Sequence, residues 1–499
     1  HTNNYFASTT HFFKPMAYIK QSLHRLLRHF SNEAAVTKPV IQDLVRESHL
    51  PTHPPPLLNL SDTRNLFSSV PTSKLLRSLI TLQLASTDGI VDIGIRAMNS
   101  ADHPSWIRTL LLTIVKHTFF NHFCGGETSA EALDCLKKLN ATGLRGMLDM
   151  AAEFAPDNKT CDQNFDLIMA TISSSASAAA SVSCVVVKMT AVYPLTLLQR
   201  ISDLLRWQHK DSSFHLPWRN NHFPIFTPSS PLHHTLTKPP TLSQEEENEL
   251  RLGWRRLAKL CEKSVEVTIP LVVDAEHSAV QPAIDYLTYS AAMEYNNGDK
   301  PIVYNTIQAY LRDAKEKVQL VTKSAEEMGF QIGVKLVRGA YMVRERRLAA
   351  ELGYQSPIHN TINETHLCYN SCAEFLLEKI SGGSGGVIIA THNVESGSIA
   401  AMKAKELGIG YGGNLEFAQL YGMADSLSFG LKNAGFRVSK YMPFGGVEKV
   451  IPYLVRRAEE NRGVLSSSGH DRELMRKELK RRMKMLNPRG PIGTYRVSS

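Results

Sequence analysis

Eight short apolar runs, separated by stretches of helical periodicity, constrain the fold of this chain most. They begin after about residue 140 and are rich in β-branched residues. Continuous hydrophobic strands that alternate with helices indicate a parallel sheet covered by helices. Eight such units close into a barrel more readily than they form an open sheet. We therefore predict an α/β fold, a distorted (β/α)8 (TIM-like) barrel, over residues 140–470. The predicted strands are 146–149, 185–188, 270–274, 302–306, 334–337, 387–391, 415–420 and 437–441.

Four further segments differ from the barrel in composition or periodicity. Residues 1–59 begin with a basic, amphipathic stretch that lacks acidic residues, typical of a mitochondrial presequence, and continue into a proline-rich linker. Residues 60–139 have helical periodicity and predict an N-terminal helical region. Residues 206–250 have little periodicity and predict an insertion between the second and third strands. Residues 471–499 form a basic C-terminal tail.

Bulk composition excludes several classes of protein. Hydrophobic residues make up 43% of the 499 residues, which is typical of a globular chain. The seven cysteines contain no CxxC pair, so we predict reduced thiols and neither a disulfide framework nor a zinc site. The adjacent His233 and His234 lack partners at metal-binding spacing, so we assign no metal. The net charge of +9 is the one feature in favour of nucleic-acid binding, and no basic-aromatic motif accompanies it.

Polar residues stand at the ends of the predicted strands. In a parallel barrel, active-site residues lie at the carboxyl ends of the strands and in the loops that follow. A set of this size at one mouth exceeds what stability requires and predicts an active site there. These residues are Lys188, Asp274, Glu276, Gln308, Lys335, Arg338, Thr391, His392, Asn393 and Tyr441.

A charged helical segment follows the last strand. Tyr453, Arg456, Arg457 and Glu460 fall on neighbouring helix faces because residues three and four apart cluster. Two adjacent guanidinium groups suit a carboxylate held by paired hydrogen bonds. Taken alone, the motif would more often be a solvated charged face.

Several motifs together resemble the proline dehydrogenase family and occur in that family's order. The resemblance covers roughly residues 140–470. It implies a barrel with FAD across its carboxyl mouth that oxidises L-proline to Δ1-pyrroline-5-carboxylate, by hydride transfer to flavin N5, in the first step of proline catabolism. It also implies a quinone or other membrane electron acceptor, and a mitochondrial protein on the matrix side that associates peripherally with the inner membrane. The motifs are KLVRGAY at 335–341, ATHN at 390–393, YGM at 421–423, YMPFG at 441–445, and YLVRR at 453–457 with Glu460-Asn461.

The resemblance also implies roles for individual residues. Arg456 and Arg457 would bind the proline carboxylate with help from Lys188, which Asp274 would help to position. Glu153, after the first strand, would pair with Arg456 and gate the site. The ring of proline would pack on Ala340, Tyr341, Leu420, Tyr441 and Tyr453. The matching FAD-binding positions are Gln308, Lys335, Val337, Gly339, Thr391, His392, Asn393 and Glu460.

Two alternatives to a proline dehydrogenase stay open. A hydroxyproline dehydrogenase needs room and a polar partner for the ring hydroxyl, and the bulky Tyr441 favours proline. A catalytically silent, membrane-associated scaffold would lose part of the set formed by Lys188, Arg456 and Arg457, yet all three are present. Apolar residues at near-helical spacing in the C-terminal tail fit a helix packed on the body of the protein better than one that touches anionic lipid.

One residue departs from the family motif. Lys335 stands where bacterial relatives often have arginine, so the positive charge is kept but the planar guanidinium group, with its paired donors, is lost.

Overall fold

The fold comes from a computed structural model that describes residues 57–87, 105–410, 412–461 and 468–486. The predicted presequence and most of its linker lie outside these residues, as does the end of the C-terminal tail. Within the described ranges, no helix combines the length and the apolar character needed to cross a membrane.

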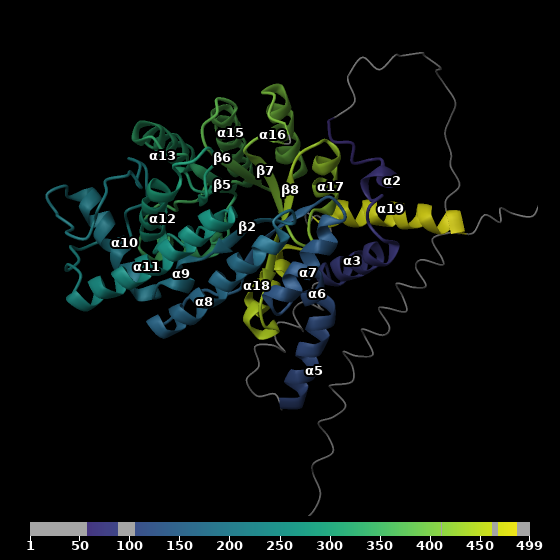
Figure 1. The fold of residues 1–499 in the computed structure, drawn as a ribbon, viewed down its shortest axis with the longest axis horizontal. Helices are drawn as coiled ribbons and strands as arrows, with labels where there is room; N and C mark the ends of the chain where they lie inside the picture. The colour runs from purple at the N-terminus through teal and green to yellow at the C-terminus, as the bar shows by residue number, and fades with distance from the viewer. Residues whose placement is uncertain (1–56, 88–104, 411, 462–467, 487–499) are drawn as a thin grey trace, which may run out of the picture. The chain divides into compact units, whose positions relative to one another are not determined.

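The predicted barrel is confirmed: eight parallel strands close a barrel in sequence order, and β8 pairs with β1 (Figure 1). The barrel is irregular where the pairing of β1 with β2 shifts register between Gly146 and Met147. The strands are β1 (Arg145–Met150), β2 (Val182–Val187), β3 (Leu271–Val273), β4 (Val303–Gln308), β5 (Gly333–Val337), β6 (Gly386–Ala390), β7 (Leu415–Leu420) and β8 (Val438–Phe444).

Alternation along the buried strands divides their side chains between two layers. In β2 every residue is buried; Val185 and Val187 belong to the core shared with the surrounding helices, whereas Val186 faces the barrel interior. Because side chains on a strand alternate between its faces, one continuous apolar run fills both layers. The interior is filled by Met147, Cys184, Val186, Val272, Ile388 and Ala418, so the barrel is packed below the mouth.

Helices cover the outside of the barrel and follow the strands in turn (Figure 1). Two of the longest begin with a capping box: Ser243 with Glu246 on α11, and Thr361 with Glu364 on α15. The helices are α8 (Asn158–Ser175), α9 (Met189–Val192), α10 (Leu195–Lys210), α11 (Gln244–Val267), α12 (Gln281–Tyr295), α13 (Ala314–Met328), α14 (Met342–Glu351), α15 (Ile362–Ser381), α16 (Val394–Glu406), α17 (Asp425–Asn433) and α18 (Val447–Glu460).

The irregular segment between β2 and β3 is shorter than the predicted insertion. Its two ends are helical, because α10 runs to Lys210 and α11 begins at Gln244, which leaves residues 211–243 without a helix or strand. The segment is tied to the barrel helices: Ser230 donates to Asp313 before α13 at 2.6 Å, and the Asn221 amide donates to Ser290 of α12 at 2.7 Å. No group of three metal-ligating side chains occurs anywhere in the described ranges.

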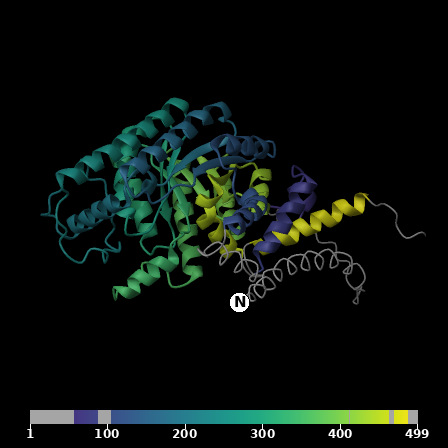
Figure 2. The same ribbon diagram turned by 90° about the horizontal axis from the view of Figure 1, so that it is seen from below.

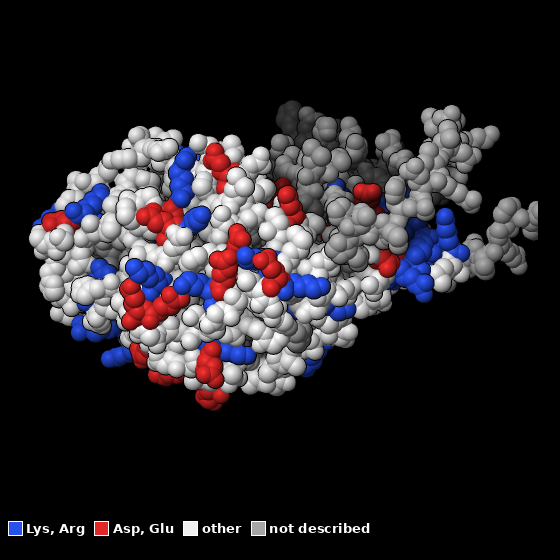
Figure 3. Space-filling view, turned by 90° about the horizontal axis from the view of Figure 1, so that it is seen from above, with Lys and Arg blue, Asp and Glu red and all other residues white. Residues whose placement is uncertain are grey.

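The segment before the barrel is helical, as predicted, and its first helices meet the C-terminal helix α19 (Ser468–Leu486). Both views show α19 beside α3 (Figures 1 and 2). Leu474, Met475 and Leu479 are buried, so α19 packs on the protein body, chiefly on α2 and α3. Acidic and basic side chains intermingle over most of the face in Figure 3, whereas Lys and Arg gather towards the end where α19 lies. The earlier helices are α2 (Thr63–Leu66), α3 (Thr72–Ala85), α5 (Ser105–Val115), the π-helix η1 (Lys116–Phe120), α6 (Asn121–Phe123) and α7 (Ser129–Asn140).

Candidate active site

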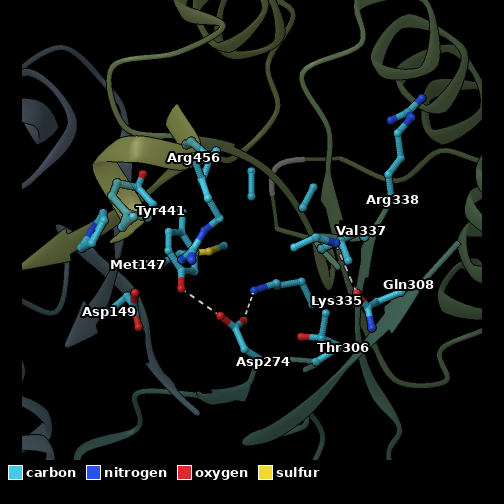
Figure 4. A pocket seen from close by; sticks show the side chains of 18 of the residues that line it. Met147, Asp149, Asp274, Thr306, Gln308, Lys335, Val337, Arg338, Tyr441 and Arg456 are labelled. Carbon is cyan, nitrogen blue, oxygen red and sulfur yellow. Dashed lines mark hydrogen bonds and ion pairs between the residues drawn. The ribbon is translucent and has the colours of Figure 1, made fainter. Parts of the chain in front are cut away.

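A cavity of about 630 Å³ opens at the carboxyl ends of the barrel strands. Figure 4 shows side chains from several strands directed into it. The site residues predicted from the sequence line this cavity, as does Glu153, with the exception of Glu276. The structure therefore brings together residues from 153 to 460 in one pocket, because parallel strands of a closed barrel all end at the same mouth.

Asp274 is the centre of a hydrogen-bonded network across the cavity floor. It forms an ion pair with Lys335, and the Tyr441 hydroxyl donates to its other oxygen at 2.8 Å (Figure 4). Burial alone would raise the pKa of Asp274, but Lys335 and Lys188 lower it below its ordinary value. The ammonium group of Lys335 also lies 5.0 Å from the centre of the Tyr441 ring. The network holds Lys335 and Tyr441 in fixed positions beside the cavity.

Lys188 has a different partner from the one predicted. Its ammonium group donates to both oxygens of Asp149, at 2.9 and 3.1 Å, whereas Asp274 bonds to Lys335. Burial favours the neutral amine, but Asp149 and the nearby carboxylates raise the pKa of Lys188, which therefore stays protonated. Burial raises the pKa of Asp149. The correction follows from the barrel: β1 and β2 are neighbours, so Lys188 at the end of β2 lies within reach of Asp149.

Asp149 is a site residue that the sequence argument misses. It is buried near the end of β1 and lines the cavity. The alternation of side chains along β1 would have identified it. Met147, two residues earlier, faces the barrel interior, so Asp149 lies on the same side of the strand. A carboxylate on the inward face of a barrel strand, one layer above an apolar residue, points towards the mouth.

The two adjacent arginines of α18 have different environments. Arg457 is buried, forms an ion pair with Glu460, and lies 4.8 Å from the centre of the Tyr453 ring. Arg456 is half-buried, extends into the cavity in Figure 4, and has no hydrogen bond or ion pair with any other described residue. The predicted pairing with Glu153 is thus not made in this structure, although both side chains line the cavity. Arg456 is the guanidinium group available to an anionic ligand.

Arg338 forms a second cationic site at the opposite side of the cavity. It donates to Thr391 at 2.6 Å, to Ser396 at 2.8 Å and to the His366 ring at 3.1 Å, and its guanidinium group lies 4.3 Å from the centre of the Tyr369 ring. The strand-end argument includes Arg338, but no role was predicted for it.

The amino end of α16 lies beside Arg338. Asn393 caps this helix by accepting a hydrogen bond from the amide of Ser396 at 2.7 Å. A helix amino terminus next to a fixed arginine is a suitable site for a phosphate group. His392 is different: burial lowers its pKa to about 3, and its Nε2 accepts from the amide of Leu420 at 3.0 Å, so the ring is neutral.

The cavity fits a flavin dinucleotide by the chemistry of its lining. Gly339, which lines the cavity, has φ +140°, and a Cβ there would lie 2.5 Å from the Tyr310 ring, so only glycine fits this position. The side-chain nitrogen of Gln419 and the hydroxyl of Tyr453 are buried at the cavity without a partner among the described residues. Cations at both sides, an apolar wall and unpaired polar atoms match a ligand with a planar ring and phosphates.

Comparison with known proteins gives a consistent result. Residues 132–470 match the family model described as proline dehydrogenase. The chain is 52% identical over 432 residues to proline dehydrogenase 2, mitochondrial, of Arabidopsis thaliana, which covers 85% of this chain and 91% of that protein. It is 32% identical over 432 residues to the hydroxyproline dehydrogenase of Rattus norvegicus, which covers 83% of this chain and 92% of that protein.

Solved structures show the same fold. Proline utilization A from Bdellovibrio bacteriovorus, inactivated by N-propargylglycine, superimposes with a TM-score of 0.57 at 24% identity. The match covers 82% of this chain and 39% of the bacterial chain, so the barrel corresponds to one part of a longer protein.

Proposed function

The chain belongs to the proline dehydrogenase family, and on this premise we propose that it oxidises L-proline to Δ1-pyrroline-5-carboxylate with a bound FAD as the hydride acceptor. The observation that carries the proposal is the unpaired guanidinium group of Arg456. It lies in a cavity that also presents apolar and aromatic side chains, among them Leu420 and Tyr441. Proline is a small zwitterion, so its pocket needs a cation for the carboxylate and an apolar wall for three methylene groups.

The pocket supplies both surfaces. Arg456 would bind the carboxylate, and Arg457, held by Glu460, would support it from the next position on α18. The rings of Tyr441 and Tyr453 line the same cavity and would pack on the pyrrolidine ring. Holding the substrate at both its charged and apolar ends orients C5 for transfer and converts the reaction into an effectively unimolecular step.

The fixed charges of the pocket also act on the substrate amine. The amine has to lose its proton before its lone pair can help to expel hydride. Lys188 stays protonated because Asp149 holds it, and Lys335 is held by Asp274. Cations near the bound amine disfavour its charged form and lower its pKa. We infer that Asp149 is a positioning residue, acting through Lys188, and that Asp274 plays the same part for Lys335.

The flavin, when bound, supplies the two-electron acceptor that no side chain of this protein provides. Arg338 and the amino end of α16 would hold its phosphates, and Lys335 would lie near the reactive edge of its ring. The residues that the family resemblance assigns to FAD all line the cavity: Gln308, Lys335, Val337, Gly339, Thr391, His392, Asn393 and Glu460.

The decisive experiment is an anaerobic titration of the purified protein, followed by its visible flavin absorbance. L-Proline is added first, and trans-4-hydroxy-L-proline is added to a second sample. Bleaching by proline at the lower concentration is the expected result, because Tyr441 occupies the wall where a ring hydroxyl would need space. Preferential bleaching by hydroxyproline would reverse the substrate assignment. A yellow protein that neither compound reduces would indicate a silent scaffold, and a colourless protein would contradict the cofactor.

We also propose that the protein works in mitochondria and passes its electrons to a quinone or another membrane acceptor. The relatives named mitochondrial support the location. The sequence of residues 1–32 supports it independently, since it carries basic residues and no acidic ones. Removing residues 1–32 is expected to abolish import into isolated mitochondria and to leave proline oxidation unchanged. Import of the shortened chain would contradict the targeting role.

A further inference from the structure

Two thiol groups lie together on α15, outside the cavity. Cys368 and Cys372 are about one helical turn apart on this helix, and both are free cysteines. Cys368 is partly exposed, whereas Cys372 is fully buried. Neither residue lines the cavity, and the proposed reaction uses neither. We call Cys368, Cys372 and the nearby His359 the thiol cluster.

The amino end of α13 meets the thiol cluster. Helices α13 and α15 pack side by side (Figure 1). Asp313, the N-cap residue of α13, makes no capping hydrogen bond with its side chain, so the amides of the first turn need other partners. The amide of Lys315, in this first turn, donates to the sulfur of Cys368. The sulfur thus lies where a helix amino terminus favours negative charge.

The side chains around Cys368 also favour its thiolate form. The hydrogen bond that Cys372 donates to Cys368 lowers the pKa of Cys368 and raises that of Cys372. The ring of His359 lowers the pKa of Cys368 further. His359 Nε2 is buried without a hydrogen-bond partner among the residues that the structure describes. Cys372 therefore keeps its proton, and Cys368 is the thiol that ionises.

Most charged groups close to the thiol cluster are positive. Lys315 is exposed, and its charge acts on the cluster. The segment before α15 is bound by Arg312, which donates to Asn360 at 2.7 Å, and by Arg346, which donates to the carbonyl of His359 at 3.2 Å. Glu364 is the acidic neighbour, 3.9 Å from the His359 ring. A partly exposed thiolate in such surroundings is reactive and attracts anionic reagents.

Helix α15 also supports Arg338. The ring of His366 accepts a hydrogen bond from Arg338 at 3.1 Å, and the guanidinium group lies 4.3 Å from the centre of the Tyr369 ring. The Tyr369 hydroxyl in turn donates to the carbonyl of Ala390 at 3.0 Å. Because Cys368 lies between His366 and Tyr369 in the chain, a change at its sulfur acts on the part of α15 that holds Arg338.

We propose that Cys368 undergoes thiol–disulfide exchange with an anionic low-molecular-weight disulfide, and that the adduct weakens flavin binding through Arg338. The Cys368 thiolate attacks one sulfur of the reagent; a new S–S bond forms and the original S–S bond breaks. One half of the reagent stays on Cys368, and the other half leaves as a thiolate that takes a proton from water. Cys368 is thereby oxidised and the leaving half is reduced. The effect on the flavin rests on the proposed function.

Helix geometry disfavours a disulfide between Cys368 and Cys372 themselves. Residues four apart on a helix have Cβ atoms about 5–6 Å apart, whereas a disulfide needs about 3.5–4.5 Å. An external disulfide meets no such limit at the partly exposed Cys368. Once substituted, the sulfur carries no charge and accepts more weakly from Cys372 and from the amide of Lys315. The start of α15 then loses its tie to α13, and Arg338 loses part of its support.

The test treats the full-length, flavin-loaded protein with glutathione disulfide and locates the adducts by mass spectrometry of its peptides. Cys135 of α7 is the matched control, because it is also partly exposed and free, but its sulfur donates to the Tyr421 hydroxyl at 3.3 Å. At pH 6, Cys368 is expected to react roughly tenfold faster than Cys135, since an ordinary thiol is then almost fully protonated. The midpoint of the pH–rate profile of Cys368 should move to higher pH in Cys372→Ala and in His359→Gln.

Flavin binding is the second readout of the same samples. The modified wild type is expected to bind flavin about tenfold more weakly than the reduced protein, as measured by fluorescence of the flavin released on dilution. Dithiothreitol should reverse the change. Cys368→Ser should keep its flavin under the same treatment, whereas Cys135→Ser should behave as the wild type does.

Several outcomes would overturn the proposal. These are no adduct on Cys368, a faster reaction at Cys135, a disulfide between Cys368 and Cys372, or an adduct that leaves flavin binding unchanged. A pH–rate midpoint that moves in neither Cys372→Ala nor His359→Gln would also overturn it. A colourless protein that still forms the Cys368 adduct would support the exchange and contradict the proposed function, so the two failures are distinguishable.

Discussion

Arg456 and Arg457 are neighbours in the chain but differ in what surrounds them. Arg457 is buried against Tyr453 and paired with Glu460, which fixes its side chain at the edge of the cavity. Arg456 is half-buried and lacks a partner in the described part of the chain. A guanidinium group that the protein leaves unpaired inside a cavity is preorganised for a ligand carboxylate. At the residue scale, the substrate assignment therefore depends mainly on Arg456.

Replacing Arg456 with Met should leave the protein folded and yellow but raise the KM for proline roughly a hundredfold, because a charge-assisted hydrogen-bond pair to the carboxylate is lost. Arg456→Lys should lose less, since the charge remains without the planar fork. The measurement is steady-state kinetics with a soluble dye, and Arg255→Met on the exposed surface of α11 is the control. An unchanged KM in Arg456→Met would contradict the proposal that Arg456 binds the carboxylate of proline.

Glu276 is a fully buried carboxyl group behind the cavity. It accepts hydrogen bonds from the Thr190 amide at 3.1 Å and the Thr190 hydroxyl at 2.7 Å, yet burial raises its pKa from 4.5 to about 7. A raised folded-state pKa means that the folded state binds the proton more tightly than the unfolded state. Stability is therefore highest below pH 4.5 for this group and is lost as pH rises through about 7.

The stability of the Glu276→Gln variant, relative to that of the wild type, should therefore increase as pH rises. The difference in free energy of unfolding, variant minus wild type, should shift in favour of the variant by up to about 3 kcal/mol between pH 4.5 and pH 8. Urea unfolding at both pH values measures the shift. A difference that stays constant with pH would show that the carboxyl group titrates in the folded state as it does in the unfolded chain.

At the scale of single elements, the amphipathic helix α11 contains a glycine for a packing reason. Gly253 lies in the middle of this 24-residue helix and is buried. A Cβ at this position would overlap the ring of Tyr193, which is itself fully buried. The missing side chain lets the helix approach Tyr193, which directly follows α9.

Gly253→Ala should therefore destabilise the protein by about 2 kcal/mol, although alanine is the better helix former by about 1 kcal/mol. The sign of the change in the free energy of unfolding is informative, because the variant is destabilised only if the packing clash outweighs the gain in helix propensity. Thermal unfolding measures the change. The double variant Gly253→Ala with Tyr193→Leu should be less destabilised than the sum of the single variants, and strict additivity would contradict the contact.

At the scale of the whole molecule, the first helices and the last helix that the structure describes are joined. Glu478 of α19 is fully buried and accepts from Arg482 at 2.7 Å, from Arg481 at 2.8 Å, and from Thr63 of α2 at 3.2 Å. Burial alone would raise its pKa, but the hydrogen bonds from both arginines lower it to about 2. Most arginines of this basic tail helix are thus used in contacts within the protein.

Glu478→Gln is expected to lower the free energy of unfolding by about 2 kcal/mol at pH 7, because Arg481 and Arg482 lose their buried partner. The stabilising effect of a carboxylate with a depressed pKa is complete above its unfolded-state pKa of 4.5 and is lost as pH falls through about 2. The loss should therefore be the same at pH 7 and pH 5. Glu473→Gln, at an exposed position one turn earlier, should have no effect.

The sequence by itself determined the elements and the mouth of the barrel. A run such as Val182–Val187 is buried on both faces wherever it lies, so its strand identity follows from local composition. Once eight such strands alternate with helices, their polar ends must meet, and for this reason residues as distant as Lys188 and Asn393 were placed in one site.

Only the tertiary structure decided which polar groups bond to one another. Asp149 rather than Asp274 holds Lys188, Arg338 binds Thr391 and Ser396, and Arg456 is left without a partner among the described residues. Local periodicity shows that a side chain faces the mouth, but an ion pair depends on distances of a few ångströms between separate strands. Those distances follow from the barrel register and from the packing of the helices around it.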